Sequence, residues 1–340
     1  MHINDFTYTL PNKQIAIHPP LIRGNSKLLI LNKNDGSIEH SEYSNFDQCI
    51  NPGDVIVVND TRVIKARIIA KCGAKTREFV LLERHSNAID VHKWKALHKG
   101  KVHEGEIYQL GDSYIKIEQV HDNGIADISC DDDIITICSN YGNVPLPPYM
   151  HRSSNKQDIE RYQTEFAKTD GSVAAPTASL NLTNHLIRRI TSKGGVVAFI
   201  TLHVGLGTFL PIRTEVIEQH EMHSEYFEVP SKTIKSINEA KTRNNRIFAV
   251  GTTVTRTLEY LYKTETPKEK DYSGEADIFI YPGYKFGVVD AMITNFHAPK
   301  STVLMMASAF AGWNNLMHAY EVALANDYKF LSYGDSMLII

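Results

Sequence analysis

The stretch Thr183–Leu202, TNHLIRRITSKGGVVAFITL, contains a helical pattern followed by a strand pattern. The helical part ends near Ser192, and the nearly continuous apolar run Val196–Leu202 is typical of a buried strand. The next segments, again read as a helix, a strand and a helix, are Ser231–Thr242, Arg246–Val250 and Thr255–Tyr262. Alternation of helices with buried strands indicates βαβ units and a layered α/β domain.

Upstream of this region, between about Val55 and Asp127, the pattern changes. Short apolar or alternating runs are separated by glycines, and we expect no helix of any length among them. The runs that we interpret as strands are Val55–Val58, Ala66–Ala70, Glu78–Leu82, Lys93–Leu97 and Tyr114–Glu118. A series of short strands with glycine turns favours a small β-barrel.

A proline-rich segment, Val144-Pro-Leu-Pro-Pro148, separates these two regions. We therefore expect an α/β body of layered βαβ units, residues 1–60 and 151–340, with a small all-β barrel, residues 61–150, inserted early in the chain. The predicted strand Lys27–Leu31 belongs to the body, and the apolar, small-residue-rich segment Val303–Trp313 is expected to be one buried helix.

The composition is that of an ordinary globular protein, with 42% hydrophobic and 22% charged residues. A net charge of −3 gives no general attraction to nucleic acid, so RNA binding requires a local basic patch. The four cysteines form no C-x-x-C pair, which argues against a zinc ribbon and favours a reducing, cytoplasmic environment. Neither a signal-peptide pattern nor a run of about 20 apolar residues is found, so we expect no membrane association.

Polar motifs follow the predicted strands of the body. In Leu202-His-Val-Gly-Leu-Gly-Thr-Phe209 the glycines allow backbone amides to approach an anion or a ribose. A tight turn with a core-facing His203 explains this motif equally well. In Val250–Glu259, glycine and hydroxyl residues stand where a helix begins, and Arg256 lies in its first turns. The amino end of this helix could bind a carboxylate or a phosphate. Simple helix capping explains these residues equally well.

Two further motifs offer chemistry. Thr294–Thr302, TNFHAPKST, gathers so many kinds of functional group that we expect ligand binding, with Lys300 facing phosphate or an acidic group and Phe296 stacking on a base. His220-Glu-Met-His-Ser-Glu225 pairs histidine with glutamate, as acid–base chemistry or a metal requires. The spacing differs from that of a zincin helix and no third ligand is near in the sequence, which argues against zinc. A histidine that is only hydrogen-bonded within a loop remains an alternative.

The last two clusters identify no reaction. Asn59-Asp-Thr-Arg62 places a carboxylate and a guanidinium at a strand end, and Gly171-Ser-Val-Ala-Ala-Pro-Thr177 has the small residues found where a ligand lies against backbone. From the residues alone, the chain is interpreted as a ligand-binding α/β enzyme with polar loops at its strand ends.

In this order the motifs resemble the S-adenosylmethionine:tRNA ribosyltransferase-isomerase family over nearly the full length. Other stretches that carry the resemblance are Pro52–Asp54, Leu146–Tyr149, Tyr162–Thr164, Phe279–Tyr284 and Ser332–Asp335. The resemblance implies an α/β body with an inserted barrel. It also implies transfer and isomerisation of the ribosyl moiety of S-adenosylmethionine onto the aminomethyl-7-deazaguanine (preQ1) base at the tRNA wobble position, which yields epoxyqueuosine-tRNA, adenine and methionine.

No metal or other cofactor is implied, because S-adenosylmethionine is consumed as a substrate, and we expect a monomer that binds preQ1-bearing tRNA. Asn181 stands where the family usually has histidine, and an amide cannot accept a proton. We therefore predict that His223 transfers the proton with Glu225 orienting it, and that His297 is the second candidate. An unperturbed imidazole titrates close to neutral pH, as a general base requires.

The residues that we expect to bind substrate are Asn59, Asp60, Arg62, Pro176, Thr177, His203, Gly205, Gly207, Thr208, Gly251, Thr252, Thr253, Arg256, Asn295, Phe296 and Lys300. Two other functions stay open. A conventional methyltransferase would place its glycine-rich loop after the first strand, whereas the G-x-G here comes late. The other alternative is a non-catalytic RNA-binding module or chaperone that kept the fold after losing activity.

Overall fold

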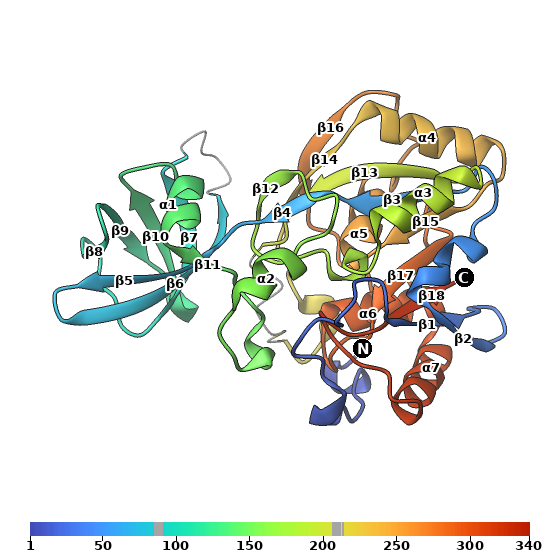
Figure 1. Ribbon diagram of the computed structural model, residues 1–340, viewed down its shortest axis with the longest axis horizontal. Coiled ribbons are helices and arrows are strands. Elements are labelled where there is room, and N and C mark those ends of the chain that lie inside the picture. Colours follow the sequence, from blue (N-terminus) through green and yellow to red (C-terminus); the bar gives the residue numbers. More distant parts are fainter. Residues whose placement is uncertain (85–90, 206–211, 213) are drawn as a thin grey trace.

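The computed structural model describes residues 1–84, 91–205, 212 and 214–340 of the chain. Figure 1 shows a larger part made of helices and a sheet, and a smaller, mostly β part at the other end of the long axis. Both chain termini lie in the larger part (Figure 1). The expected α/β body with an inserted β-barrel is confirmed.

The body contains a nine-stranded sheet. Its order is β16 (Tyr272–Ala276), β14 (Glu225–Val229), β13 (Val196–Leu202), β3 (Val55–Asn59), β15 (Ile247–Val250), β17 (Ala291–Asn295), β18 (Ser336–Ile339), β1 (Lys27–Leu31) and β2 (Ile38–Glu42). The central strands β13, β3, β15 and β17 are mutually parallel, and β14 and β18 flank them in the antiparallel direction. Every residue of β3, β15 and β17 is buried, which explains why their sequences are continuous apolar runs.

Helices cover both faces of this sheet. Strand β3 shows the division, because Val55 and Val57 pack on one face and Ile56 and Val58 on the other. The first face is covered by α4 (Ser231–Thr242), α5 (Thr252–Leu261), α6 (Thr302–Ala311) and α7 (Trp313–Ala325). The second face is covered by α3 (Asn184–Ser192) and the 3₁₀ helix η3 (Tyr43–Cys49).

The expectation of one buried helix over Val303–Trp313 is wrong at its carboxyl end. Helix α6 stops at Ala311, and α7 begins at Trp313. Gly312 between them has a φ of 79°, a conformation that side-chain-bearing residues rarely adopt and that a continuous helix cannot contain.

The smaller part is a closed antiparallel barrel. Its strands are β5 (Arg67–Cys72), β6 (Lys75–Arg84), β7 (Lys93–Lys99), β10 (Ile125–Cys130), β9 (Ser113–Val120) and β8 (Ile107–Leu110) in spatial order, and the short β11 (Gly142–Asn143) pairs with β5. Pairing of Lys71 with Gln109 joins β5 to β8 and closes the ring. The barrel has its own apolar core, which includes Phe79, Trp94 and Tyr108.

Residues 61–150, which we expected to form an all-β barrel, also contain the helix α1 (Ile134–Tyr141), which lies beyond the Val55–Asp127 stretch in which we expected no helix. The Asp133 carboxylate accepts the amide hydrogen of Ile135 at 2.7 Å and so caps the helix, while Ile134, Ile137 and Cys138 are buried in the barrel core. Strands β4 (Thr61–Val63) and β12 (Thr169–Ser172) form a separate parallel pair between the two parts (Figure 1). We propose that residues 61–150 form the insert and that this pair connects it to the body.

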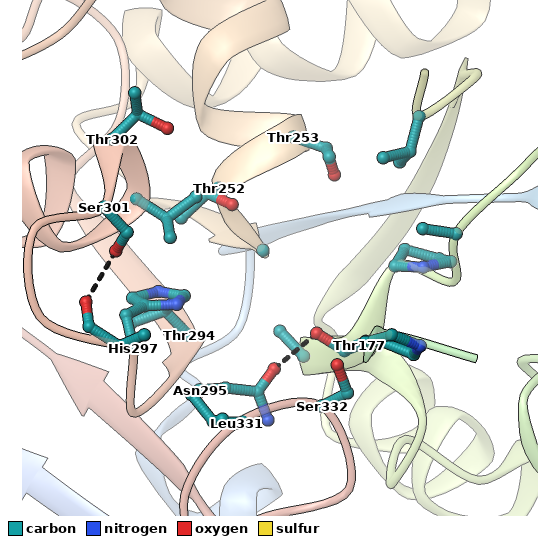
Figure 2. A pocket seen from close by; sticks show the side chains of 18 of the residues that line it. Thr177, Thr252, Thr253, Thr294, Asn295, His297, Ser301, Thr302, Leu331 and Ser332 are labelled. Carbon is teal, nitrogen blue, oxygen red and sulfur yellow. Dashed lines mark hydrogen bonds between the residues drawn. The ribbon is translucent and has the colours of Figure 1, made fainter. Parts of the chain in front are cut away.

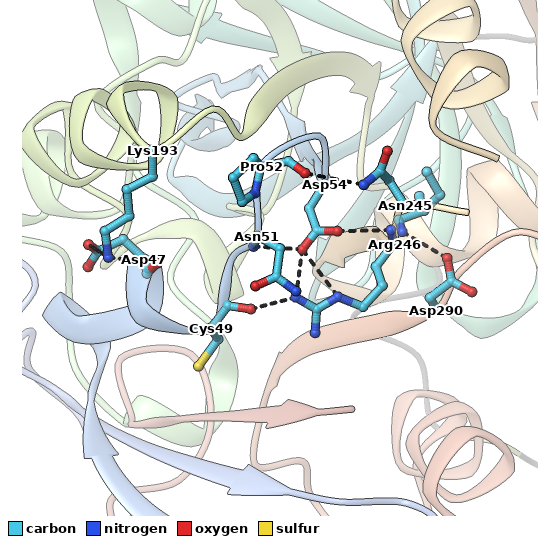
Figure 3. A network of polar contacts seen from close by, with 10 residues as sticks. Asp47, Cys49, Asn51, Pro52, Asp54, Lys193, Asn245, Arg246 and Asp290 are labelled. Atoms are coloured by element: carbon cyan, nitrogen blue, oxygen red, sulfur yellow. Dashed lines mark hydrogen bonds and ion pairs between the residues drawn. The ribbon is translucent and has the colours of Figure 1, made fainter. Parts of the chain in front are cut away.

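The amino ends of the central strands are held by a polar network (Figure 3). The buried Asp54 carboxylate, just before β3, accepts hydrogen bonds from Arg246 N at 2.9 Å, Arg246 Nη2 at 2.6 Å and Asn51 N at 2.9 Å. Asp290, just before β17, accepts the amide hydrogen of Ile247 at 2.8 Å. These contacts hold the amino ends of β3, β15 and β17. The polar motifs that follow these parallel strands lie together at the opposite edge of the sheet, where the strands end.

Candidate functional site

A cavity of about 510 Å³ lies at the carboxyl ends of the parallel strands. Its wall includes Val204 after β13, Gly251–Thr253 after β15, Asn295 at the end of β17, and His297–Val303 after it. Ligands of open α/β sheets bind at this edge, because the backbone amides beyond the strand ends are not used in hydrogen bonds between strands. The volume is in the range of small-molecule binding pockets.

Many of the residues expected to act on or bind substrate line this cavity (Figure 2). They are Pro176, Thr177, Glu225, Gly251, Thr252, Thr253, Arg256, Asn295, His297 and Lys300. Segments that are far apart in the chain therefore meet at one place.

Several lining residues were not among the predicted site residues. They are chiefly Pro147, Tyr149, Tyr162, Thr294, Ser301, Thr302, Leu331 and Ser332. Tyr149, Tyr162 and Ser332 lie in stretches that carry the family resemblance, which is the signal that could have identified them. The amide of Ser332 donates to the Tyr149 hydroxyl at 2.9 Å, and burial raises the pKa of Tyr149 to about 12.

The start of α5 forms one wall. Gly251, the N-cap residue of the helix, has a φ of 104° and no side chain that could cap the first amides. Arg256 Nη1 donates to Glu225 Oε2 at 2.5 Å, and both residues are buried. Glu225 Oε1 accepts the amide hydrogen of the buried Gly205 at 3.4 Å. Within the described part of the chain, Arg256 Nε and the Thr253 hydroxyl are buried without a hydrogen-bond partner.

The loop after β17 forms another wall. The Thr177 hydroxyl donates to Asn295 Oδ1 at 2.7 Å (Figure 2). His297 Nε2 lies 2.6 Å from the Thr294 hydroxyl, and burial lowers the pKa of His297 to about 3, so its imidazole is neutral near pH 7. Lys300 is exposed at the wall with a φ of 57°, and its amide donates to Phe6 O at 2.8 Å.

Other predicted binding residues are not among the described residues that line the cavity. Asn59 is fully buried and joins β3 to β13, because it donates to Leu202 O at 2.9 Å and accepts from Leu202 N at 3.0 Å. Asp60 accepts from the Thr201 hydroxyl at 2.6 Å, and burial raises its pKa. His203 lies 2.8 Å from the Thr61 hydroxyl.

Arg62 and Phe296 are likewise outside the described lining. Arg62 is exposed and donates to Ala167 O at 2.8 Å. Phe296 is fully buried in an aromatic cluster with Tyr320, Tyr328 and Phe330, so no face of its ring is open to a base. The stacking role expected for Phe296 is therefore not available in this structure.

The predicted catalytic residues are arranged differently from our expectation. His223 is not among the described residues that line the cavity; it is half-buried in the segment before β14, and its neighbours Met222 and Glu225 do line the cavity. In the described structure Glu225 bonds Arg256 and Gly205, and no hydrogen bond joins it to His223, so it does not orient that ring here. The predicted residues Gly207 and Thr208 lie outside the described residues.

Among the residues that the structure describes, no group of three or more His, Cys, Asp or Glu side chains is arranged to hold a metal ion. Within the same described ranges, each helix is too short or too polar to cross a bilayer.

Comparison with known proteins gives a consistent relationship over the whole chain. The family described as queuosine biosynthesis protein matches residues 3–339. The S-adenosylmethionine:tRNA ribosyltransferase-isomerases of Chlorobaculum parvum and Chlorobium chlorochromatii are 48% and 46% identical to the chain, with all of each protein aligned. A crystal structure of the S-adenosylmethionine tRNA ribosyltransferase of Thermotoga maritima superposes with a TM-score of 0.58 at 31% identity, covering 99% of this chain and 100% of that one. The chain therefore belongs to the queuosine biosynthesis protein family.

Proposed function

We propose that the protein transfers and isomerises the ribosyl moiety of S-adenosylmethionine onto the preQ1 base at the wobble position of tRNA. The products are epoxyqueuosine-tRNA, adenine and methionine. One observation carries this proposal: motifs between Pro147 and Ser332, which also carry the family resemblance, line a single cavity at the ligand-binding edge of the sheet. The full-length relatives named for this reaction support it.

The reaction sets clear demands on the site. The sulfonium of S-adenosylmethionine acidifies the adjacent C5′ protons, so a positioned base removes one of them and adenine leaves. The aminomethyl nitrogen of the tRNA base then attacks the sugar fragment, and methionine departs as the epoxide closes. The site must therefore offer a proton acceptor and hold both ends of S-adenosylmethionine in place.

We propose His223 as the proton acceptor. Its segment is bounded by two residues of the cavity wall, Met222 and Glu225. His297 suits the role less well, because an imidazole whose pKa is lowered to about 3 is a weak base. Its neutral ring can instead exchange hydrogen bonds with a hydroxyl group of the sugar, as it does with Thr294.

We further propose that neither a metal nor another cofactor takes part and that the protein works as a cytoplasmic monomer. The dispersed cysteines and the donor set of the described residues support the absence of a metal. The exposed Lys300 at the cavity wall is the cation that we propose to meet the phosphate backbone of the incoming tRNA.

The test is incubation of the purified protein with S-adenosylmethionine and preQ1-bearing tRNA, followed by nucleoside analysis. We expect epoxyqueuosine in the tRNA and an equal amount of free adenine, and no product with tRNA that lacks preQ1. Formation of S-adenosylhomocysteine would instead identify a methyltransferase. RNA binding without either product would identify a non-catalytic RNA-binding protein.

A further inference from the structure

Three charged residues line the described cavity wall, and two of them are buried. Lys300 is exposed, whereas the side chains of Arg256 and Glu225 are only 7% and 5% exposed and form an ion pair of 2.5 Å. Ionised groups removed from water need several hydrogen bonds to offset the lost hydration. A buried pair that lacks these bonds is therefore suited to receive them from a ligand.

This pair lacks several of them. A guanidinium carries five N–H donors, yet Arg256 Nε has no hydrogen-bond partner among the described residues. Glu225 Oε2 is bonded to Arg256, and among the residues that the structure describes Oε1 has only a contact of 3.4 Å with the Gly205 amide. Both residues belong to the cavity wall. A positively charged hydrogen-bond donor, Arg256, and a carboxylate acceptor, Glu225, thus lie side by side in the wall.

The adjacent turn of α5 adds donors on the same side. Thr253 precedes Arg256 by three residues, a spacing that places two side chains on one helix face. Its hydroxyl is buried without a partner in the described structure, and Figure 2 shows it beside Thr252 at the start of the helix. The aligned peptide dipoles of this ten-residue helix give its amino end a partial positive charge toward the cavity, and the N-cap residue Gly251 has no side chain that could cap the first amides.

We infer that this cluster binds the α-amino-acid head group of S-adenosylmethionine, an assignment that rests on the proposed function. The carboxylate of the substrate lies against Arg256, the Thr253 hydroxyl and the amino end of α5, and its ammonium lies against Glu225. Each of the four charges then has an opposite neighbour. Glu225 is therefore a binding residue rather than the group that orients His223.

The pairing of charges makes the site selective. A phosphate or a simple carboxylate would meet Arg256 but would also bring a second negative charge close to Glu225. A simple amine would meet Glu225 but would leave the donors of Arg256 and Thr253 unused. A zwitterion is the ligand class that satisfies both halves of the pair, which distinguishes this site from a plain anion site at a helix start.

The inference is tested by calorimetric titration of the unmodified protein with three nucleosides that lack the sulfonium and are not consumed. S-Adenosylhomocysteine carries both head-group charges, its decarboxylated form carries only the ammonium, and 5′-methylthioadenosine carries neither. We expect the dissociation constant to rise about 10- to 100-fold with each charge lost, because a hydrogen bond to a charged group contributes that much.

A conservative variant complements this series. Thr253→Val removes the hydroxyl at nearly constant volume, and we expect it to weaken S-adenosylhomocysteine about tenfold while leaving 5′-methylthioadenosine unchanged. Thr242→Val, in an exposed turn at the end of α4, is the matched control and should alter neither value.

Equal affinity for S-adenosylhomocysteine and 5′-methylthioadenosine would overturn the head-group assignment and leave the proposed function standing. Equal loss of both nucleosides in Thr253→Val would also overturn it, since the hydroxyl would then act on the fold of the cavity. If the unmodified protein bound none of the three nucleosides, the proposed function would fall together with the assignment.

Discussion

The hydroxyl of Thr177 donates a hydrogen bond of 2.7 Å to Oδ1 of Asn295, which stands 118 residues further along the chain. Asn295 ends β17, and its Nδ2 donates in turn to Asp335 O at 3.4 Å, next to the start of β18. The amide side chain of Asn295, at the end of a central strand, thus bonds both the Pro176–Thr177 segment of the cavity wall and the segment just before β18. The position of the Pro176–Thr177 wall depends on this contact.

Replacing Thr177 by valine tests that dependence. The variant loses one hydrogen bond and leaves Asn295 Oδ1 without its donor, so we expect a loss of about 1 kcal/mol in the free energy of unfolding. We also expect the KM for S-adenosylmethionine to rise several-fold in an adenine-release assay, because the wall shifts. Thr264→Val, in an exposed loop, is the control. An unchanged KM would show that the wall is held without this bond.

The Asp54–Arg246 network at the opposite edge predicts a purely structural effect. Asp54→Asn replaces a carboxylate that accepts two side-chain bonds from Arg246, and we expect the free energy of unfolding to fall by about 2 kcal/mol. Glu239→Gln, which removes an exposed ion pair with Arg243, should cost less than about 0.5 kcal/mol. Urea unfolding measures both. A large loss of turnover in folded Asp54→Asn would contradict the separation of this network from the cavity.

Asp158 predicts a pH dependence of stability. Burial opposes ionisation of this carboxyl, but hydrogen bonds from Arg152, Asn155 and Tyr333 outweigh burial and lower its pKa below 3.8. Its stabilising contribution is therefore present above the unfolded-state pKa and is lost as the pH falls through the folded-state value. Asp158→Asn should lose about 2 to 4 kcal/mol at pH 7. We expect its difference from the parent protein to shrink between about pH 5 and about pH 3.

Urea unfolding at several pH values measures this difference. Glu239→Gln again serves as the control, because that carboxylate is exposed in a surface pair. A constant difference between Asp158→Asn and the parent down to about pH 3 would show that the charge of Asp158 contributes nothing and that only its hydrogen-bond geometry matters.

Much of the fold could be predicted because, in its most regular elements, the local sequence pattern agrees with the secondary structure that forms. Strand β13 and helix α4 have the bounds that the sequence pattern predicts, since one is continuously apolar and the other has regular helical spacing. Helix α1 could not be predicted, because Ile134-Ile-Thr-Ile137 is rich in β-branched residues that favour strands. Its helical form depends on the Asp133 cap and on burial against the barrel, which only the tertiary structure supplies.

The site could be predicted where it follows parallel strands, because the ends of such strands meet at one edge. Gly251 and Asn295 are examples, and both line the cavity. Tyr149 and Ser332 could not be placed from local pattern, since their contact joins the proline-rich segment to the loop before β18. Phe296 was expected to stack on a base because its neighbours in the motif are polar, yet its ring belongs to the aromatic core.

Removal of metal ions should leave activity intact. The described residues contain no cluster of three potential ligands, and the four cysteines lie apart in the sequence. We expect the rate of adenine release to be unchanged after dialysis against a chelator, provided that the tRNA is refolded with magnesium before the assay. Loss of activity that zinc restores would contradict this prediction.

The proton acceptor is tested by comparing two histidines. Removing a general base lowers turnover by about 10² to 10⁴, so His223→Ala should slow adenine release by that order. Because His223 is only half-buried, the free energy of unfolding should stay within about 1 kcal/mol of the parent. Adenine release and thermal unfolding of the same preparations give the two values.

His297→Gln is the matched comparison, because glutamine keeps a hydrogen-bonding group in the cavity wall but cannot act as a base. Since burial already lowers the pKa of His297 to about 3, we expect this variant to retain turnover within about tenfold and to change the KM more than kcat. Near-normal turnover in His223→Ala with a large loss in His297→Gln would transfer the proton-accepting role to His297. Collapse of the folded state in His223→Ala would instead show that this ring supports the loop before β14.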